Sequence, residues 1–417
     1  MVGQLGATTV AAVGLAGQIF FLLNLLIFGI GSGSAMFTAQ LWGKRDVPNI
    51  HKVLGLALAL ALVGSMLFVI IAEIFPTFAL KIYSEDPQVI AIGSNYLRTF
   101  GFSFVFFAIS ATYSLILRSV GEVRLPVIIS IFALALNIIL SYLLIFGKLG
   151  LPQLGANGAA VSILISRIIE CTLLVSFTYI YKLPPAARPR EMFDFNLAFA
   201  GKVLKPVLPV AVNEILWSLG ITTYQVIYAH IGTAQVAAVN IATTISDLAV
   251  VAFMGIGNAT AIMVGNMIGS GKDDPAQIYA GRSLVIGAVG GIIIGLSVWL
   301  ISPYILDLYR VSPIVIAYTK ALLLISCSFL WLRMMNLIQF IGIFRAGGDT
   351  RFALILDGFI IWLVGVPLAA IGAFVLDLPV YLVYGLTLSE EMVKWAIGLW
   401  RYFSKKWIHN LTEIVPN

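Results

Sequence analysis

Long uninterrupted apolar runs, separated by short polar segments, are the main pattern of this 417-residue sequence. A helix needs about 20 apolar residues to cross a bilayer. The runs are continuously apolar and lack the alternation of membrane-spanning strands. Runs of sufficient length occur near 10–40, 52–75, 88–117, 125–146, 157–181, 203–229, 235–268, 279–301, 314–343, 352–375 and 379–402. The pattern therefore predicts an all-α polytopic membrane protein with about eleven transmembrane helices.

Composition and charge add an orientation to this prediction. The chain is 60% hydrophobic and 11% charged, far from the balance of a soluble domain. Basic residues gather in alternate loops, which the positive-inside rule places in the cytoplasm. These residues include Lys44, Arg45, Lys52, Arg118, Arg124, Lys182, Arg188, Arg190, Lys202, Lys205, Lys272, Arg282, Arg345, Arg351, Arg401, Lys405 and Lys406, whereas the opposite loops hold Lys81, Lys148 and Arg310. We expect a multi-pass protein of the plasma (inner) membrane with a cytoplasmic C-terminus. Its net charge of +6 needs no nucleic-acid partner to explain it.

The sequence also repeats itself. Positions 6–43 align with 232–269, so that Gly29-Ile30-Gly31 falls on Gly255-Ile256-Gly257. The repeat predicts two pseudo-symmetric helical lobes, 1–181 and 203–417, joined by a cytoplasmic connector at 182–202. A duplicated membrane chain is typical of transporters, in which the substrate site lies between two lobes that move.

The repeat is unequal at its start. The second lobe has a full apolar run, 203–229, before its copy begins at Gly232, whereas the first copy begins almost at once, at Gly6. Charge places Met1 outside, with no preceding segment to carry it across the membrane. We therefore expect that a first transmembrane helix is missing before Met1. The alternative is a natural protein with an odd number of helices, which would need a translocated N-terminus and an incomplete repeat.

Motifs for enzymatic chemistry are not recognised in the sequence. Gly269-Ser270-Gly271-Lys272 resembles part of a phosphate loop, but Asp273 stands where the motif needs Ser or Thr. The three histidines and two cysteines are not clustered, so neither a metal site nor a disulfide framework is predicted. We expect a protein that is not an enzyme and has no cofactor.

At the level of motifs, the chain resembles the multidrug and toxic compound extrusion (MATE) family of secondary transporters. The resemblance rests on segments that span essentially the whole chain: Val2-Gly3-Gln4-Leu5-Gly6, Val10-Ala11-Ala12-Val13, Gly29-Ile30-Gly31, Val236-Ala237-Ala238-Val239-Asn240-Ile241-Ala242, Gly255-Ile256-Gly257 and Arg345-Ala346-Gly347-Gly348-Asp349-Thr350-Arg351. It implies twelve helices in two six-helix lobes, which exchange a cation gradient for an exported organic substrate. The family also places a cation-coupling acid in the helix that holds Glu214. In one branch an aspartate in the first helix carries coupling, and this chain lacks that helix.

Ionisable residues inside the apolar runs are the candidate coupling sites, because a charge in a bilayer span costs a few kcal/mol. Glu214, Asp247 and Asp357 are the candidates for binding H⁺ or Na⁺, and Na⁺ at Glu214 is the one metal ion considered. The alternative for each is a structural contact between helices. Two further pairs, Arg167 with Glu170 and Glu390 with Lys394, have helical spacing and are interpreted as structural ion pairs.

Polar and aromatic side chains in the runs are candidates for a substrate cavity. Asn336 and Gln339 continue a stripe that begins at Arg333 and recurs every third residue. The predicted cavity residues are Asn24, Asn137, Asn213, Trp217, Asn336 and Gln339. Polar groups also join membrane helices to one another, so plain packing remains the alternative.

The leading functional hypothesis is a monomeric antiporter that exports organic cations, drugs or toxic metabolites in exchange for H⁺ or Na⁺ by alternating access. A lipid-linked saccharide or lipid flippase of the same superfamily is the alternative. A flippase would favour a strongly cationic cavity, and only Arg167 and Arg333 lie deep in the runs. A membrane-embedded enzyme is a remote third hypothesis, because no nucleophile with a base and no metal cluster is found.

Overall fold

Helices form nearly all of the structure, a computed structural model that describes residues 1–307, 309 and 311–413. Arg310, one of the few basic residues of the loops predicted to be outside, lies beyond the described residues. The longer helices are α1 (Ala7–Lys44), α2 (Val47–Ile74), α4 (Pro87–Gly101), α5 (Ser103–Ser119), α6 (Arg124–Phe146), α7 (Ala156–Ile180), α9 (Leu197–Ile231), α10 (Thr233–Gly269), α11 (Asp273–Leu306) and α12 (Pro313–Leu337). The chain then continues through η2 (Ile338–Arg345), α13 (Thr350–Ala353), η3 (Leu354–Phe359), η4 (Ile361–Gly365), α14 (Val366–Phe374), α15 (Val380–Thr387) and α16 (Ser389–Phe403).

Within the described residues, nine helices are long and apolar enough to cross a membrane. The number becomes ten if α4 and α5, which meet at a bend of 47°, form one span. The eleventh predicted run, 379–402, folds as the separate helices α15 and α16. These findings confirm an all-α polytopic membrane protein.

Local sequence signals set several helix ends. The Asp46 side chain accepts a hydrogen bond from the Asn49 backbone N–H at the start of α2, and Asp86 does the same for Gln88 at the start of α4. Such N-caps satisfy donors that have no partner within the helix. Gly147 ends α6 with φ 65°, a left-handed conformation that glycine adopts without steric cost.

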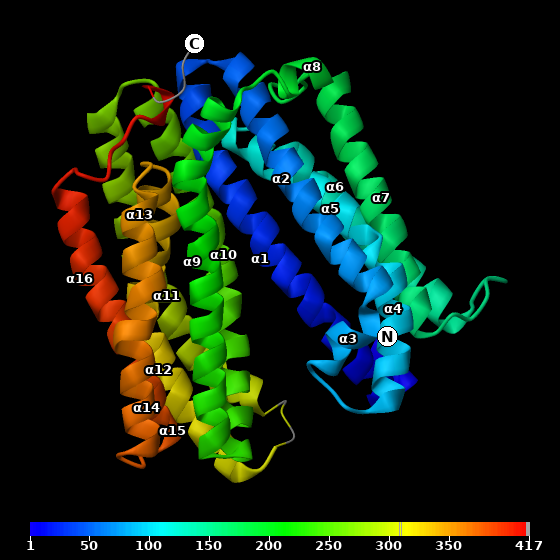
Figure 1. The fold of residues 1–417 in the computed structure, drawn as a ribbon. Coiled ribbons are helices and arrows are strands. Elements are labelled where there is room, and N and C mark those ends of the chain that lie inside the picture. Colours follow the sequence, from blue (N-terminus) through cyan, green and yellow to red (C-terminus); the bar gives the residue numbers. More distant parts are fainter. Residues whose placement is uncertain (308, 310, 414–417) are drawn as a thin grey trace. The chain divides into compact units, whose positions relative to one another are not determined.

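The chain divides into two compact units. The first comprises residues 1–38 and 45–204, and the second comprises 39–44 and the chain from Lys205 onward. In the first unit α6 packs against α7 and α2 packs against α5 (Figure 1). Its core contains a cluster of aromatic rings, in which Phe20 lies 5.3 Å from Phe100 and 4.9 Å from Phe107 between ring centroids. The short helix α8 (Pro189–Met192) lies in the predicted connector and packs against α2.

In the second unit α12 packs against both α10 and α11. The chain from Ile338 to Gly365 contains three π-helical segments, η2, η3 and η4, where the apolar pattern predicted ordinary helix. Wide π-turns are rare and occur frequently at functional sites. These segments carry Arg345 and Asp357, so the irregular backbone coincides with buried charges.

Candidate functional site

A buried group of three charged side chains lies in the second unit. The Lys394 Nζ of α16 is 3.1 Å from Asp357 Oδ1 of η3 and 3.4 Å from Glu390 Oε1, one helical turn earlier on α16. The side chains of Asp357, Glu390 and Lys394 are only 14%, 6% and 2% exposed. We refer to these three residues as the lysine triad. The predicted pairing of Glu390 with Lys394 is confirmed, and Lys394 also binds Asp357.

Neutral donors complete the lysine triad. Asn213 Nδ2 of α9 donates a 2.9 Å hydrogen bond to Asp357 Oδ2, and the Tyr224 hydroxyl of the same helix donates one of 2.9 Å to Glu390 Oε2. Each of the four carboxylate oxygens therefore has one partner. With all three groups ionised the triad carries one excess negative charge, because one ammonium faces two carboxylates.

Glu214 forms a separate ion pair in the same unit. Its Oε1 atom lies 2.7 Å from Arg345 Nη2, and both side chains are buried. The pair joins α9 to η2. Sequence analysis singled out Glu214 but did not identify Arg345 as its partner, because the two residues are far apart in the chain. The arrangement satisfies the charge of Glu214 without a bound ion.

The third predicted coupling residue, Asp247, lies on an exposed face of α10. Asp357, by contrast, is largely buried and forms its direct ion pair with Lys394. Among the described residues no group of three or more His, Cys, Asp or Glu side chains could hold a metal ion.

The predicted cavity residues are divided between the units. Asn24 and Asn137 belong to the first unit, whereas Asn213, Trp217, Asn336 and Gln339 belong to the second. Asn336 is buried and donates a 2.7 Å hydrogen bond to Glu391 Oε2 of α16. Gln339 is fully buried, and neither its Oε1 nor its Nε2 has a hydrogen-bond partner. Asn24 and Trp217 are exposed.

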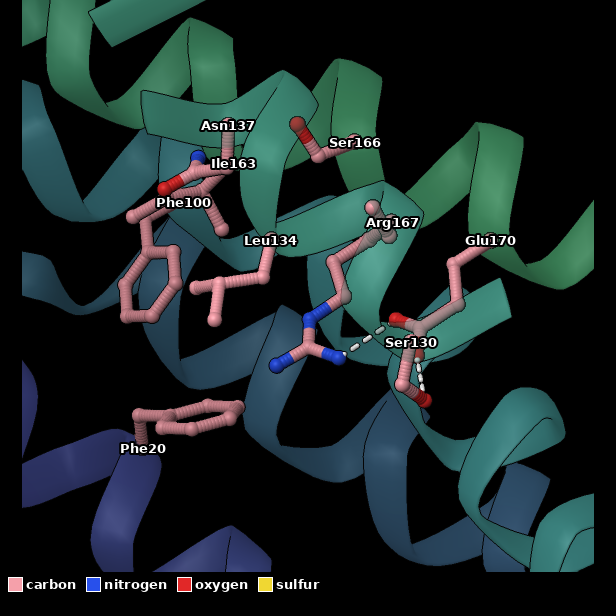
Figure 2. Close-up of a pocket in the computed structure, with 10 residues that line it drawn as sticks. Phe20, Phe100, Ser130, Leu134, Asn137, Ile163, Ser166, Arg167 and Glu170 are labelled. Atoms are coloured by element: carbon pink, nitrogen blue, oxygen red, sulfur yellow. Dashed lines mark hydrogen bonds and ion pairs between the residues drawn. The ribbon is translucent and has the colours of Figure 1, made fainter. Parts of the chain in front are cut away.

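A pocket of about 510 Å³ opens within the first unit (Figure 2). We call it the α6–α7 pocket, because those two helices supply most of its lining. Its residues are Phe20 of α1, Phe100 of α4, Ser130, Ala133, Leu134 and Asn137 of α6, and Ile163, Ser166, Arg167 and Glu170 of α7. On each of α6 and α7 the four residues follow the spacing i, i+3, i+4, i+7, which defines one helix face. The volume lies in the range of small-molecule sites, about 300–1,000 Å³.

The charged residues of the α6–α7 pocket form the ion pair that their spacing predicted. Arg167 Nη1 donates a 2.6 Å hydrogen bond to Glu170 Oε2, and Ser130 Oγ donates one of 2.8 Å to Glu170 Oε1. Figure 2 shows both contacts. Sequence analysis did not predict the contributions of Ser130, Phe20 and Phe100. The one available signal was the i, i+3, i+4, i+7 spacing of the lining residues on α6 and on α7, which places them on one face of each helix.

Together, the apolar helices, the two units and the buried charges define the chain as a polytopic membrane protein with polar sites inside its helical units. The family model described as MatE matches residues 1–143 and 209–371. This protein belongs to the MATE family and is a transporter rather than an enzyme.

Individual relatives agree with this assignment. The probable multidrug resistance protein YoeA of Bacillus subtilis is 26% identical over 370 residues, which cover 88% of this chain and 79% of YoeA. The probable multidrug resistance protein NorM of Agrobacterium fabrum is 26% identical over 396 residues, covering 90% of this chain and 81% of the relative. The crystal structure of a mutant of the Vibrio cholerae MATE transporter VcmN superposes with a TM-score of 0.89 at 19% identity, over 98% of this chain and 91% of VcmN. That structural similarity concerns the fold.

Proposed function

We propose that this protein is a secondary active antiporter that exports organic compounds from the cell in exchange for H⁺, by alternating access of its two units. Membership of the MATE family and the multidrug resistance names of its relatives support the export of drugs or toxic metabolites. The working unit is a monomer, because the internal duplication places both lobes in one chain. It resides in the cell membrane with its C-terminus in the cytoplasm.

The observation that carries the coupling proposal is the lysine triad. Its single ammonium faces two carboxylates, so a proton on Glu390 converts a net charge of −1 into a neutral group. A buried net charge is unfavourable, and the two protonation states therefore favour different degrees of burial. Proton relays in pumps and transporters use intramembrane carboxylates in this way.

Proton coupling is favoured over Na⁺ coupling by the occupancy of the carboxylate oxygens. Lys394, Asn213 and Tyr224 already supply one partner to each oxygen of Asp357 and Glu390. Glu214 is likewise held by Arg345. A metal cation needs several oxygen ligands at once, whereas a proton needs a free lone pair on only one oxygen.

Dye accumulation in cells that lack their own efflux pumps tests the proposal. The probes are rhodamine B, which carries a free carboxylate, and its ethyl ester, which is a cation. Cells that express the protein should accumulate less of at least one dye, and this difference should vanish when the H⁺ gradient is collapsed but not when the Na⁺ gradient is collapsed. Asp357→Asn and Glu390→Gln should abolish export, whereas Asp274→Asn, at an exposed ion pair with Lys405, should not. Export that requires only the Na⁺ gradient would contradict the proposal.

A further inference from the structure

The polarity of the α6–α7 pocket points to a substrate class. Arg167 and Glu170 are its two charged lining residues, and they differ in exposure: the Arg167 side chain is 33% exposed, the Glu170 side chain only 8%. Both oxygens of Glu170 already accept hydrogen bonds, one from Arg167 and one from Ser130. The more accessible charge of the pair is therefore the positive one.

The guanidinium has donors to spare. One of its amino groups binds Glu170, and Figure 2 shows the other turned away from Glu170, toward the side of the pocket where Phe20 lies. A guanidinium carries five N–H donors in a planar fork that matches a carboxylate, phosphate or sulfonate. Its carbon also lies 5.1 Å from the centre of the Phe107 ring, which helps to hold the guanidinium plane in position.

The remainder of the pocket is suited to a flat apolar body. Phe20 and Phe100 contribute rings that contact each other at 5.3 Å, and Leu134 and Ile163 lie beside them. Aromatic rings bind other rings in stacked or edge-to-face arrangements. Asn137 adds a neutral polar group at the α6 side of the pocket (Figure 2).

We propose that the α6–α7 pocket binds aromatic compounds that carry an anionic end, with Arg167 as the residue that recognises the anion. Zwitterions with a carboxylate belong to this class, whereas aromatic compounds with only a positive charge do not, because they offer no anion to the free side of the guanidinium. Glu170 and Ser130 act as positioning residues: they fix one side of the guanidinium so that the other side faces the ligand. This inference rests on the proposed export function, since it names the substrates of that export.

Binding of rhodamine B and its ethyl ester to the purified full-length protein tests the proposal. The protein is placed in nanodiscs of phosphatidylcholine, and fluorescence anisotropy is corrected with empty nanodiscs. The two dyes differ only in the free carboxylate. We expect rhodamine B to bind roughly tenfold or more tightly than the ester. This difference in affinity is what a hydrogen bond between the dye carboxylate and the Arg167 guanidinium would contribute.

The variants separate recognition from folding. Arg167→Gln leaves Glu170 buried without its cation and can therefore disturb folding, so the decisive variant is Arg167→Gln with Glu170→Gln, which removes both charges. It should bind the two dyes equally, while Arg167→Lys should retain part of the preference. The matched control is Arg98→Gln, at an exposed position of α4 outside the pocket, which should keep the full preference.

Three results would overturn the assignment: equal binding of both dyes to the unaltered protein, a preference that survives in the double variant, or displacement of rhodamine B by phosphatidylglycerol added to the nanodiscs. The last result would show that Arg167 holds a lipid phosphate. The assay uses no ion gradient, so its outcome is independent of coupling. Loss of coupled export with an intact preference would contradict the proposed function alone.

Discussion

Removing the ammonium of Lys394 is expected to destabilise the protein strongly. Lys394→Met preserves the approximate length of the side chain but leaves Asp357 and Glu390 buried with no cation. All three side chains are at most 14% exposed, so solvent screens their interaction little. Removing one partner of a buried ion pair costs about 3–5 kcal/mol. We expect a loss of unfolding free energy in that range.

Reversible unfolding of the purified protein in mixed detergent–SDS micelles measures this loss. Lys405→Met is the matched control, because it makes the same chemical change at a pair whose side chains are 58% and 84% exposed. Such a surface pair should contribute no more than about 1 kcal/mol. Combining Lys394→Met with Asp357→Asn should cost less than the sum of the single changes, with a coupling energy of about 1–3 kcal/mol. Equal losses for Lys394→Met and Lys405→Met would refute the argument that the triad is a buried charge network.

Two further predictions concern the second unit. Gly269→Ala would place a methyl group against the backbone carbonyl of Gln40, so we expect a loss of about 1–3 kcal/mol in the same unfolding assay. The control is Gly255→Ala on the same helix, where nothing lies within 4 Å of the added methyl group. This change should be neutral or should stabilise the protein by up to about 1 kcal/mol. Equal effects of the two changes would contradict the packing argument. Glu214→Gln should destabilise the protein, because it leaves Arg345 buried without its anion. In a double-mutant cycle, combining Glu214→Gln with Arg345→Met should recover part of this loss of unfolding free energy. Strictly additive losses would show that the two side chains do not interact energetically.

The apolar pattern predicted the helices well because burial in a bilayer requires long continuous runs. The run expected at 125–146 corresponds to α6, Arg124–Phe146, whose end is set by Gly147. The pattern could not predict the π-turns of η2, η3 and η4, since a wide turn adds one residue without changing the apolar character of the run. It also treated 379–402 as one helix, whereas the chain divides at Leu388 into α15 and α16.

Sequence spacing revealed contacts within a helix and missed contacts between helices. Arg167 with Glu170 and Glu390 with Lys394 were recognised because residues three or four apart share a helix face. Asp357 and Glu214 were selected as isolated buried charges, and their cationic partners were found only in the folded chain. The proposed preference of the α6–α7 pocket for an anion depends on which member of the pair is more exposed, which spacing alone does not reveal.

Transport by purified protein in proteoliposomes tests the central claim most directly. Vesicles loaded with rhodamine B or its ethyl ester would be given an inward H⁺ gradient or an inward Na⁺ gradient, and dye efflux would be recorded together with internal pH. The account predicts that dye leaves under the H⁺ gradient alone, that the interior acidifies in step, and that Glu390→Gln abolishes both signals. Efflux driven by Na⁺ with no proton movement, or unaltered proton-coupled efflux in Glu390→Gln, would contradict it.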